Sequence, residues 1–193
     1  NGKKRKVVNA LGLKIKLKSK SFNYTTLHYL LAMLKAYGLK YAIGSPGGQN
    51  ANFNFLLQEE CSIKTFSVID ERSAGYTAIG IYNETNEPVV LSCTGSSASR
   101  NYVPSMSEAF YKKIPLIAVT LFDYDSTKYS SKPQFIDRST TQNDIKYISI
   151  ELPRIQDESD KKRCLTYLNA ALSTAFYKHL PVHINCPSAF DFD

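Results

Sequence analysis

The sequence predicts an α/β fold: a three-layer, doubly wound parallel sheet of about six strands with helices on both faces, preceded by a basic N-terminal arm. Two observations carry this prediction. Short apolar runs alternate with helical segments along most of the 193 residues, and such βαβ units build parallel sheets. The runs are also apolar almost throughout, as expected of strands that helices cover on both faces.

The predicted elements follow one another in simple alternation. The strands cover residues 41–44, 65–69, 89–93, 116–121, 146–152 and 182–186. The first helix begins at Asn23 or Thr25 and ends at Gly38, a suitable left-handed residue. The later helices cover residues 50–59, 71–83, 102–112 and 160–178. Residues 122–144 are polar and irregular, which predicts a long loop of the kind that is often functional.

The basic charge of the chain is confined to its start. The net charge is +7, and residues 1–20 contain eight lysines and arginines but no acid. We therefore expect a basic, largely solvated arm over residues 1–22 and one domain over residues 23–193. Within the arm, residues 13–18 alternate apolar and basic side chains, which indicates a short edge strand. Because the domain itself is nearly neutral, we expect no nucleic-acid partner and no membrane contact, although a basic arm leaves both as alternatives.

Cysteines and histidines give no sign of a metal site. The four cysteines, Cys61, Cys93, Cys164 and Cys186, form no CxxC pair, so zinc binding is not predicted. Cys93 and Cys186 end apolar strands and are predicted to be buried free thiols, which indicates a reducing compartment such as the cytoplasm. The histidines, His28, His179 and His183, are scattered singly and are predicted to be packing or surface residues.

Four segments follow predicted strands at their carboxyl ends, where open parallel sheets bind ligands. They are residues 45–50, 70–73, 94–99 and the loop around Gln134. The turn at 45–48 contains two glycines, so its backbone can approach a ligand closely. Residues 94–97 offer hydroxyls and amides that suit either an anion or helix capping. The acids at 70–71 are equally well explained by the helix dipole, which is worth about 0.3–1 kcal/mol.

Four sequence blocks, taken together and in order, resolve that ambiguity. They are YGLKYAIGSPG at 37–47, VIDERSAGY at 68–76, CTGSSASRNYVP at 93–104 and PVHINCP at 181–187. The set resembles the N-terminal pyrimidine-binding (PYR) domain of thiamine-diphosphate-dependent enzymes. It is most similar to that of the menaquinone-pathway 2-succinyl-5-enolpyruvyl-6-hydroxy-3-cyclohexene-1-carboxylate synthases. The resemblance covers residues 24–187, nearly everything except the arm.

The resemblance implies a thiamine-diphosphate-dependent 2-oxo acid decarboxylase or carboligase. In such enzymes a glutamate hydrogen-bonds N1′ of the cofactor's aminopyrimidine, so that its 4′-imino nitrogen can take the C2 proton of the thiazolium. The matching residue is Glu71, the expected catalytic group. Cofactor contacts are then expected from Ser45, Pro46, Gly47, Thr94, Gly95, Ser96 and Asn101. Substrate contacts are expected from Gln49, Asn50, Ser97 and Gln134.

The same resemblance implies a partner. Enzymes of this kind hold the cofactor's diphosphate through Mg²⁺ on a domain with a Gly-Asp-Gly motif, which this sequence lacks. We therefore expect the isolated chain to be inactive. The diphosphate-binding part is expected in the same longer polypeptide, with a separate subunit as the alternative. A homo-oligomer, dimer or tetramer, and a small 2-oxo acid substrate are also implied.

One departure from the family pattern bears on the substrate. Residues 48–50 are Gly-Gln-Asn where the menaquinone-pathway enzymes have Ser-Arg-Asn, and the neutral Gln49 cannot replace an arginine charge. This predicts a different 2-oxo acid or acceptor, for example in a surface-glycan pathway. The alternative function is a non-catalytic or regulatory PYR-fold module that pairs with another subunit. The retained Glu71 favours the catalytic interpretation.

Overall fold

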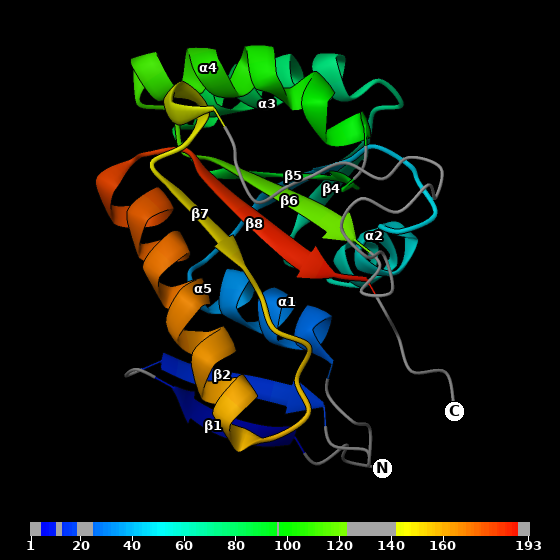
Figure 1. Cartoon of the computed structure of the whole chain (residues 1–193), viewed down its shortest axis with the longest axis vertical. Helices are drawn as coiled ribbons and strands as arrows, with labels where there is room; N and C mark the ends of the chain where they lie inside the picture. Colours follow the sequence, from blue (N-terminus) through cyan, green and yellow to red (C-terminus); the bar gives the residue numbers. More distant parts are fainter. Residues whose placement is uncertain (1–4, 11–12, 19–24, 96, 123–141, 189–193) are drawn as a thin grey trace.

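The computed structural model describes residues 5–10, 13–18, 25–95, 97–122 and 142–188 of the chain. Its main body is a six-stranded sheet with the strand order β4-β3-β5-β6-β8-β7, in which every neighbouring pair is parallel (Figure 1). The predicted α/β class and parallel sheet are therefore confirmed.

All six predicted strands are present, with ends displaced by at most two residues. They are β3 (Tyr41–Gly44), β4 (Lys64–Ser67), β5 (Val89–Thr94), β6 (Leu116–Phe122), β7 (Ile148–Glu151) and β8 (Val182–Pro187). The predicted helices are also found: α1 (Thr26–Ala36), α2 (Ala51–Gln58), α3 (Glu71–Thr85), α4 (Val103–Lys112) and α5 (Glu158–Lys178). Two short 3₁₀ helices, η1 (Ser97–Tyr102) and η2 (Asn143–Ile145), were not predicted.

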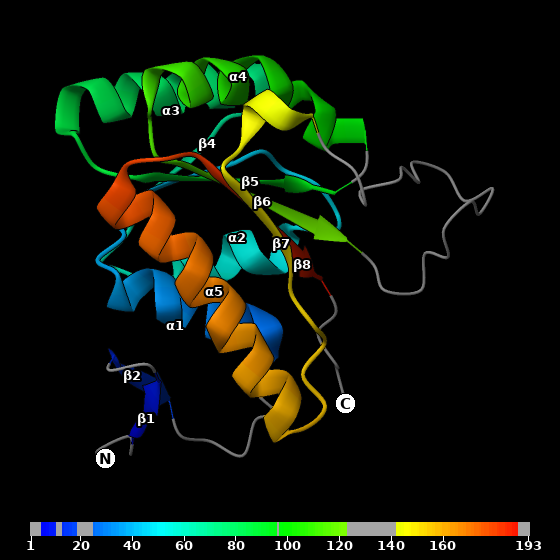
Figure 2. The same cartoon turned by 60° about the vertical axis from the view of Figure 1, so that its left-hand side comes forward.

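Helices cover both faces of the sheet, as Figure 2 shows for the pairs α3–α4 and α1–α5. The side chains of β5 alternate between the two faces, with Val90 facing the core under α1, α2 and α5 and Leu91 facing the core under α3 and α4. This alternation follows from the period of two in a strand. It explains why the strand sequences are apolar at nearly every position.

The basic N-terminal segment contains a second, two-stranded antiparallel sheet. It joins β1 (Arg5–Ala10) to β2 (Leu13–Lys18), with Arg5 opposite Lys18 and Ala10 opposite Leu13. The strand predicted at 13–18 is confirmed, and it lies beside α1 (Figure 1). The expectation of an open arm did not include β1, because a run of charges followed by two valines shows no period of two.

Three of the four free cysteines are buried, and Cys61 is exposed. The prediction that Cys93 and Cys186 are buried thiols is therefore confirmed. Burial raises the pKa of the Cys164 thiol to about 12 and also raises the pKa of Cys93 and Cys186. Such thiols stay protonated and chemically inert. Across the described ranges, none of the helices has the length and apolar composition that crossing a bilayer requires.

Candidate functional site

The sheet has a topological switch point between β3 and β5. The chain leaves β3 through α2 to reach β4 on one side, and it leaves β5 through α4 to reach β6 on the other. At such a point the connecting loops diverge and open a crevice at the carboxyl ends of the strands, where ligands bind. The segment 45–50 follows β3, and the segment 94–99 follows β5. The topology therefore brings two of the four predicted segments to this crevice, with residues 70–73 following the adjacent β4.

Asn50 fastens the turn after β3 to the neighbouring strand. Its side chain is fully buried, and Nδ2 donates to Ser45 O at 2.8 Å, to Ser92 Oγ at 3.1 Å and to Ser92 O at 3.2 Å. The Ser45 amide also donates to Ser92 O at 2.8 Å. The amide nitrogen of Asn50, predicted to contact substrate, is thus used inside the protein. It holds the turn in place beside β5.

Gly47 lies directly against Thr94 across the switch point. A β-carbon at Gly47 would overlap Thr94 Oγ1 and would lie 3.0 Å from Asn50 Oδ1. Only glycine allows this close approach. Gly95 is packed as tightly, because a β-carbon there would lie 2.7 Å from the backbone oxygen of Leu121. The two glycines therefore let the turn after β3 pack against Thr94 and the turn after β5 pack against the end of β6.

Glu71 is paired with Asn101, which the sequence had placed in the same site. The Asn101 Nδ2 donates to Glu71 Oε2 at 3.2 Å. The cap of α3 is the preceding residue: Asp70 accepts a hydrogen bond from the Ser73 amide at 2.7 Å, and this bond lowers the pKa of Asp70. Asp70 therefore caps the helix, while Glu71 lies in its first turn, where a negative charge also interacts favourably with the helix dipole. Glu71 is half-buried, and Asn101 orients its carboxylate from η1.

Two buried groups, Cys93 and Tyr102, lie near Glu71 and were not predicted from the sequence to belong to the site. Cys93 is fully buried and Tyr102 is only 2% exposed. Burial, and to a lesser degree the neighbouring Cys93 and Glu71, raise the pKa of Tyr102, and burial followed by the charge of Glu71 raises that of Cys93. Both groups therefore remain neutral beside the carboxylate. Each adjoins a predicted site residue in sequence, Thr94 or Asn101, but an apolar strand and a helical aromatic predict core equally well.

Buried polar atoms without a partner are concentrated at this site. Among the described residues, they are Ser45 Oγ, Gln49 Oε1, Asn50 Oδ1, Asn54 Oδ1 and Tyr102 OH. Ser45 Oγ and the Tyr102 phenol are neighbours, but neither has full hydrogen-bond geometry with any described group. Folded proteins satisfy the great majority of buried polar atoms. Their concentration here is what a site completed by a ligand would show.

A cavity of about 300 Å³ adjoins the turn on the α2 side. Its lining includes Gly44, Pro46 and Gly47 from β3 and the following turn, and Asn54 from α2. The volume is at the lower end of the range for small-molecule sites. Pro46 is exposed at this surface and Gln49 is half-buried.

For the remaining predicted site residues, the structure gives only a position or no description. Ser97 is exposed at the start of η1, one turn before Asn101. Ser96 and Gln134 lie outside the described residues. Of the four predicted segments, the structure therefore brings three together at one edge of the sheet.

Comparison with known proteins identifies the family of the chain. The family described as thiamine pyrophosphate enzyme, N-terminal TPP binding domain, matches residues 24–150. The chain belongs to this family. Thiamine pyrophosphate is another name for thiamine diphosphate, so the resemblance drawn from the sequence blocks is confirmed. The matched range of this thiamine diphosphate enzyme domain contains Glu71, Asn101 and both glycine turns.

Curated relatives point to one enzyme within the family. The chain is 33% identical over 159 residues to the 2-succinyl-5-enolpyruvyl-6-hydroxy-3-cyclohexene-1-carboxylate synthase of Phocaeicola vulgatus, covering 82% of this chain and 28% of the relative. It is 33% identical over 171 residues to the same enzyme of Enterococcus faecalis, covering 84% and 29%. The match in Lactococcus lactis is 32% over 157 residues, covering 78% and 28%. The chain thus spans less than a third of the length of these relatives.

Proposed function

We propose that this chain supplies the pyrimidine-binding half of a thiamine diphosphate site in a 2-oxo acid decarboxylase or carboligase. The observation that carries the proposal is the Glu71–Asn101 hydrogen bond at the switch-point crevice. It pairs a carboxylate, which caps nothing, with an amide that fixes its orientation. Family membership implies that the cofactor is thiamine diphosphate. The carboxyl group of Glu71, oriented by Asn101, is the group that would act on it.

The residues present fit the cofactor. Glycines at positions 47 and 95 let the two turns pack closely against Thr94 and Leu121, and Ser45 and Asn50 leave buried oxygen atoms without partners in the described region. We infer that the ring is held between the turn of Ser45, Pro46 and Gly47 and the segment of Thr94, Gly95, Ser96 and Asn101. When bound, thiamine diphosphate supplies the electron sink that allows a 2-oxo acid to lose CO2 and its remaining carbons to be transferred.

Glu71 is proposed to be the group that would hydrogen-bond the ring nitrogen N1′ of the cofactor. Asn101 occupies Oε2, so the carboxyl group cannot rotate freely and Oε1 keeps one direction. The nearby Cys93 and Tyr102 are neutral and add no competing charge.

The remainder of the proposed active site comes from elsewhere. A diphosphate-binding domain or subunit would hold Mg²⁺ and the diphosphate, in a homo-oligomeric complete enzyme. Gln49, Ser97 and Gln134 are proposed to face the small 2-oxo acid, whereas the fully buried Asn50 holds the turn in place. Because Gln49 is neutral, we propose a substrate or acceptor that differs from that of the relatives. The free thiols support a reducing compartment, the cytoplasm.

Cofactor titration of the complete enzyme tests this proposal. We expect saturable, Mg²⁺-dependent binding of thiamine diphosphate, followed by the change in intrinsic protein fluorescence. No affinity in the complete enzyme would overturn the proposal and would favour the non-catalytic PYR-fold module. The 193-residue chain by itself is expected to bind weakly in either case, so it is not the deciding sample.

A further inference from the structure

The α2-side cavity, of about 300 Å³, lies between α2 and the edge of the sheet. Its floor is formed by β3 and β4, where Ala42 lies opposite Thr65 and Gly44 lies opposite Ser67. All four floor residues are small, so they leave open space beside the helix. The residues that α2 contributes recur at helical spacing and are Ala51, Asn54, Phe55 and Gln58.

The polar side chains that line this cavity are not used by the protein. They are the amides of Asn54 and Gln58 and the hydroxyls of Thr65 and Ser67. None of the four has a hydrogen-bond partner within the described part of the chain. Asn54 Oδ1 is buried, and buried polar atoms normally have partners inside a protein. A few convergent polar groups in an otherwise apolar hollow are typical of small-molecule sites.

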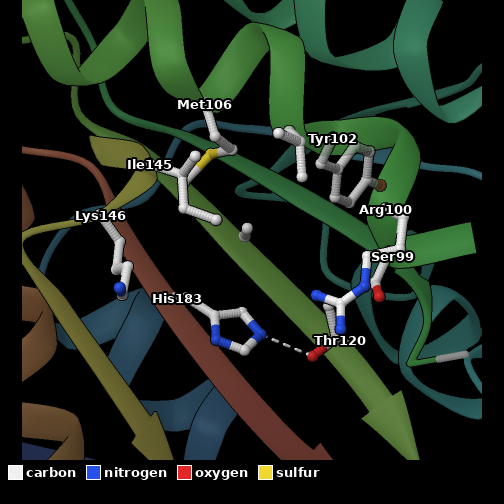
Figure 3. Close-up of a pocket in the computed structure, with 10 residues that line it drawn as sticks. Ser99, Arg100, Tyr102, Met106, Thr120, Ile145, Lys146 and His183 are labelled. Carbon is white, nitrogen blue, oxygen red and sulfur yellow. Dashed lines mark hydrogen bonds between the residues drawn. The ribbon is translucent and has the colours of Figure 1, made fainter. Parts of the chain in front are cut away.

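A second cavity, on the α3–α4 face of the sheet, shows the opposite arrangement. Its volume is about 40 Å³, and it lies between α4 and the strands β6 and β8 (Figure 3). Two of the polar residues that line it bind within the protein, because Thr120 Oγ1 donates to Asn185 Oδ1 at 2.9 Å and lies 2.8 Å from His183 Nε2. Of these two cavities, the α2-side cavity is therefore the larger and the one with free hydrogen-bonding groups.

The chemistry of the lining favours an uncharged ligand. Among the described residues, no charged side chain lines the α2-side cavity. The Lys64 amine lies 5.3 Å from the centroid of the Phe66 ring, but Lys64 is not one of the lining residues. A carboxylate or phosphate would lose part of its water here without meeting a cation in the lining, which costs free energy. A neutral molecule avoids that cost.

Phe55 gives the cavity an exposed apolar surface. Its side chain is 59% exposed, so its ring can pack against the C–H groups of a ligand. The amides and hydroxyls of the lining both donate and accept hydrogen bonds, as the hydroxyl groups of a ligand do. An apolar carbon face and several hydroxyl groups occur together in a sugar ring and in similar polyols.

We propose that the α2-side cavity binds a small uncharged polyhydroxy compound, such as a single sugar ring. Its hydroxyl groups would bind Thr65, Ser67 and the two amides, and its carbon face would pack on Phe55. The cavity volume is at the lower end of the range for small-molecule sites, which suits one ring. Glu71 does not line this cavity, and the proposal does not depend on thiamine diphosphate.

Saturation-transfer difference NMR of the complete protein, without thiamine diphosphate, tests the proposal. The polyol probes are methyl α-D-glucopyranoside, N-acetyl-D-glucosamine and myo-inositol, and nicotinamide serves as an uncharged aromatic amide for comparison. We expect saturable transfer to at least one of the polyols, strongest at the C–H protons of one ring face. Transfer to nicotinamide without transfer to any polyol would overturn the proposed ligand class.

Two variants locate the binding. Thr65→Val keeps the shape of the side chain but removes its hydroxyl, and it should weaken binding by about threefold to tenfold, the value of one hydrogen bond. Phe55→Ala should weaken it by a similar factor. Asn52→Ala on α2 and Thr77→Val on α3 change residues outside the lining and are the matched controls. Thermal unfolding of each variant confirms that it is folded.

Two outcomes would overturn the proposal. One is the absence of saturable transfer to any polyol, and the other is equal weakening in the control variants. Since no cofactor is present in these experiments, either outcome would leave the role of Glu71 unaffected.

Discussion

Asn101 Nδ2 lies 3.2 Å from Glu71 Oε2, so the short helix that follows β5 holds the first side chain of α3. The two residues are 30 positions apart in sequence and meet because β3 alone separates β4 from β5. We propose that this hydrogen bond orients the carboxyl group of Glu71.

The first prediction tests that coupling. Asn101→Ala should slow exchange of the C2 proton of bound thiamine diphosphate by about tenfold, because Glu71 loses the charge-assisted bond that orients it. Added to Glu71→Gln, the same change should have little further effect, since residues that act as a unit are not additive. Asn83→Ala, at an exposed position of α3, is the matched control. Full additivity in the double variant would mean that the two side chains act separately.

A second prediction concerns the glycine turn. Gly47→Ala would drive a methyl group into Thr94 Oγ1, and relieving that overlap costs about 1–3 kcal/mol. We expect a lower unfolding temperature and at least tenfold weaker cofactor binding. Gly48→Ala is the control, because a β-carbon there meets nothing within 4 Å. Removing the obstacle with Thr94→Ala should restore the stability of the Gly47→Ala protein, and a failure to do so would place the strain elsewhere.

A third prediction compares two glycines of one helix. A β-carbon at Gly75 would overlap the Ser105 hydroxyl and lie 2.6 Å from Ser105 Cβ, where α3 crosses α4. Gly75→Ala should therefore destabilise the fold by about 1–3 kcal/mol. At Gly80 a β-carbon meets nothing within 4 Å, so Gly80→Ala should stabilise the helix by about 0.5–1 kcal/mol. Urea denaturation measures both, and equal effects would contradict the close crossing.

A fourth prediction concerns pH. Burial lowers the pKa of His28, while the unfolded chain has a value of about 6.5. Above that value the ring is neutral in both states, so the free energy of unfolding does not depend on pH through His28. As the pH falls below it, the unfolded state takes up the proton first, so the free energy of unfolding decreases. His28→Asn should flatten this decrease between about pH 7 and pH 5. An unchanged slope in His28→Asn would exclude the linkage.

Much of the fold was predictable because the local sequence is unambiguous. The strands β5 and β6 read as apolar runs, and Asp70 and Gly38 mark helix ends in the expected way. The strand β1 was missed because its stability comes from pairing with β2, which no local pattern records. The 3₁₀ helix η1 was missed for a similar reason: its residues read as a small polar turn.

The site was predictable as a set of strand ends but not as a network. Glu71 and Asn101 were each named from sequence, but their hydrogen bond depends on the order of the strands. Asn50 was expected to face the substrate, and only the fold shows its amide nitrogen bound to Ser45 and Ser92. The neighbourhood of Tyr102 was invisible for the same reason, since a buried phenol in a site and one in a core have the same sequence pattern.

The most direct test of the central claim is the rate of C2 proton exchange of thiamine diphosphate bound to the complete enzyme, measured by NMR after transfer to D2O. We predict that Glu71→Gln slows this exchange by at least about a hundredfold, as expected for loss of a group in general acid–base catalysis, while Glu84→Gln, an exposed acid of the same helix, leaves it unchanged. Exchange at the unmodified rate in Glu71→Gln, with the cofactor still bound, would contradict the role assigned to Glu71.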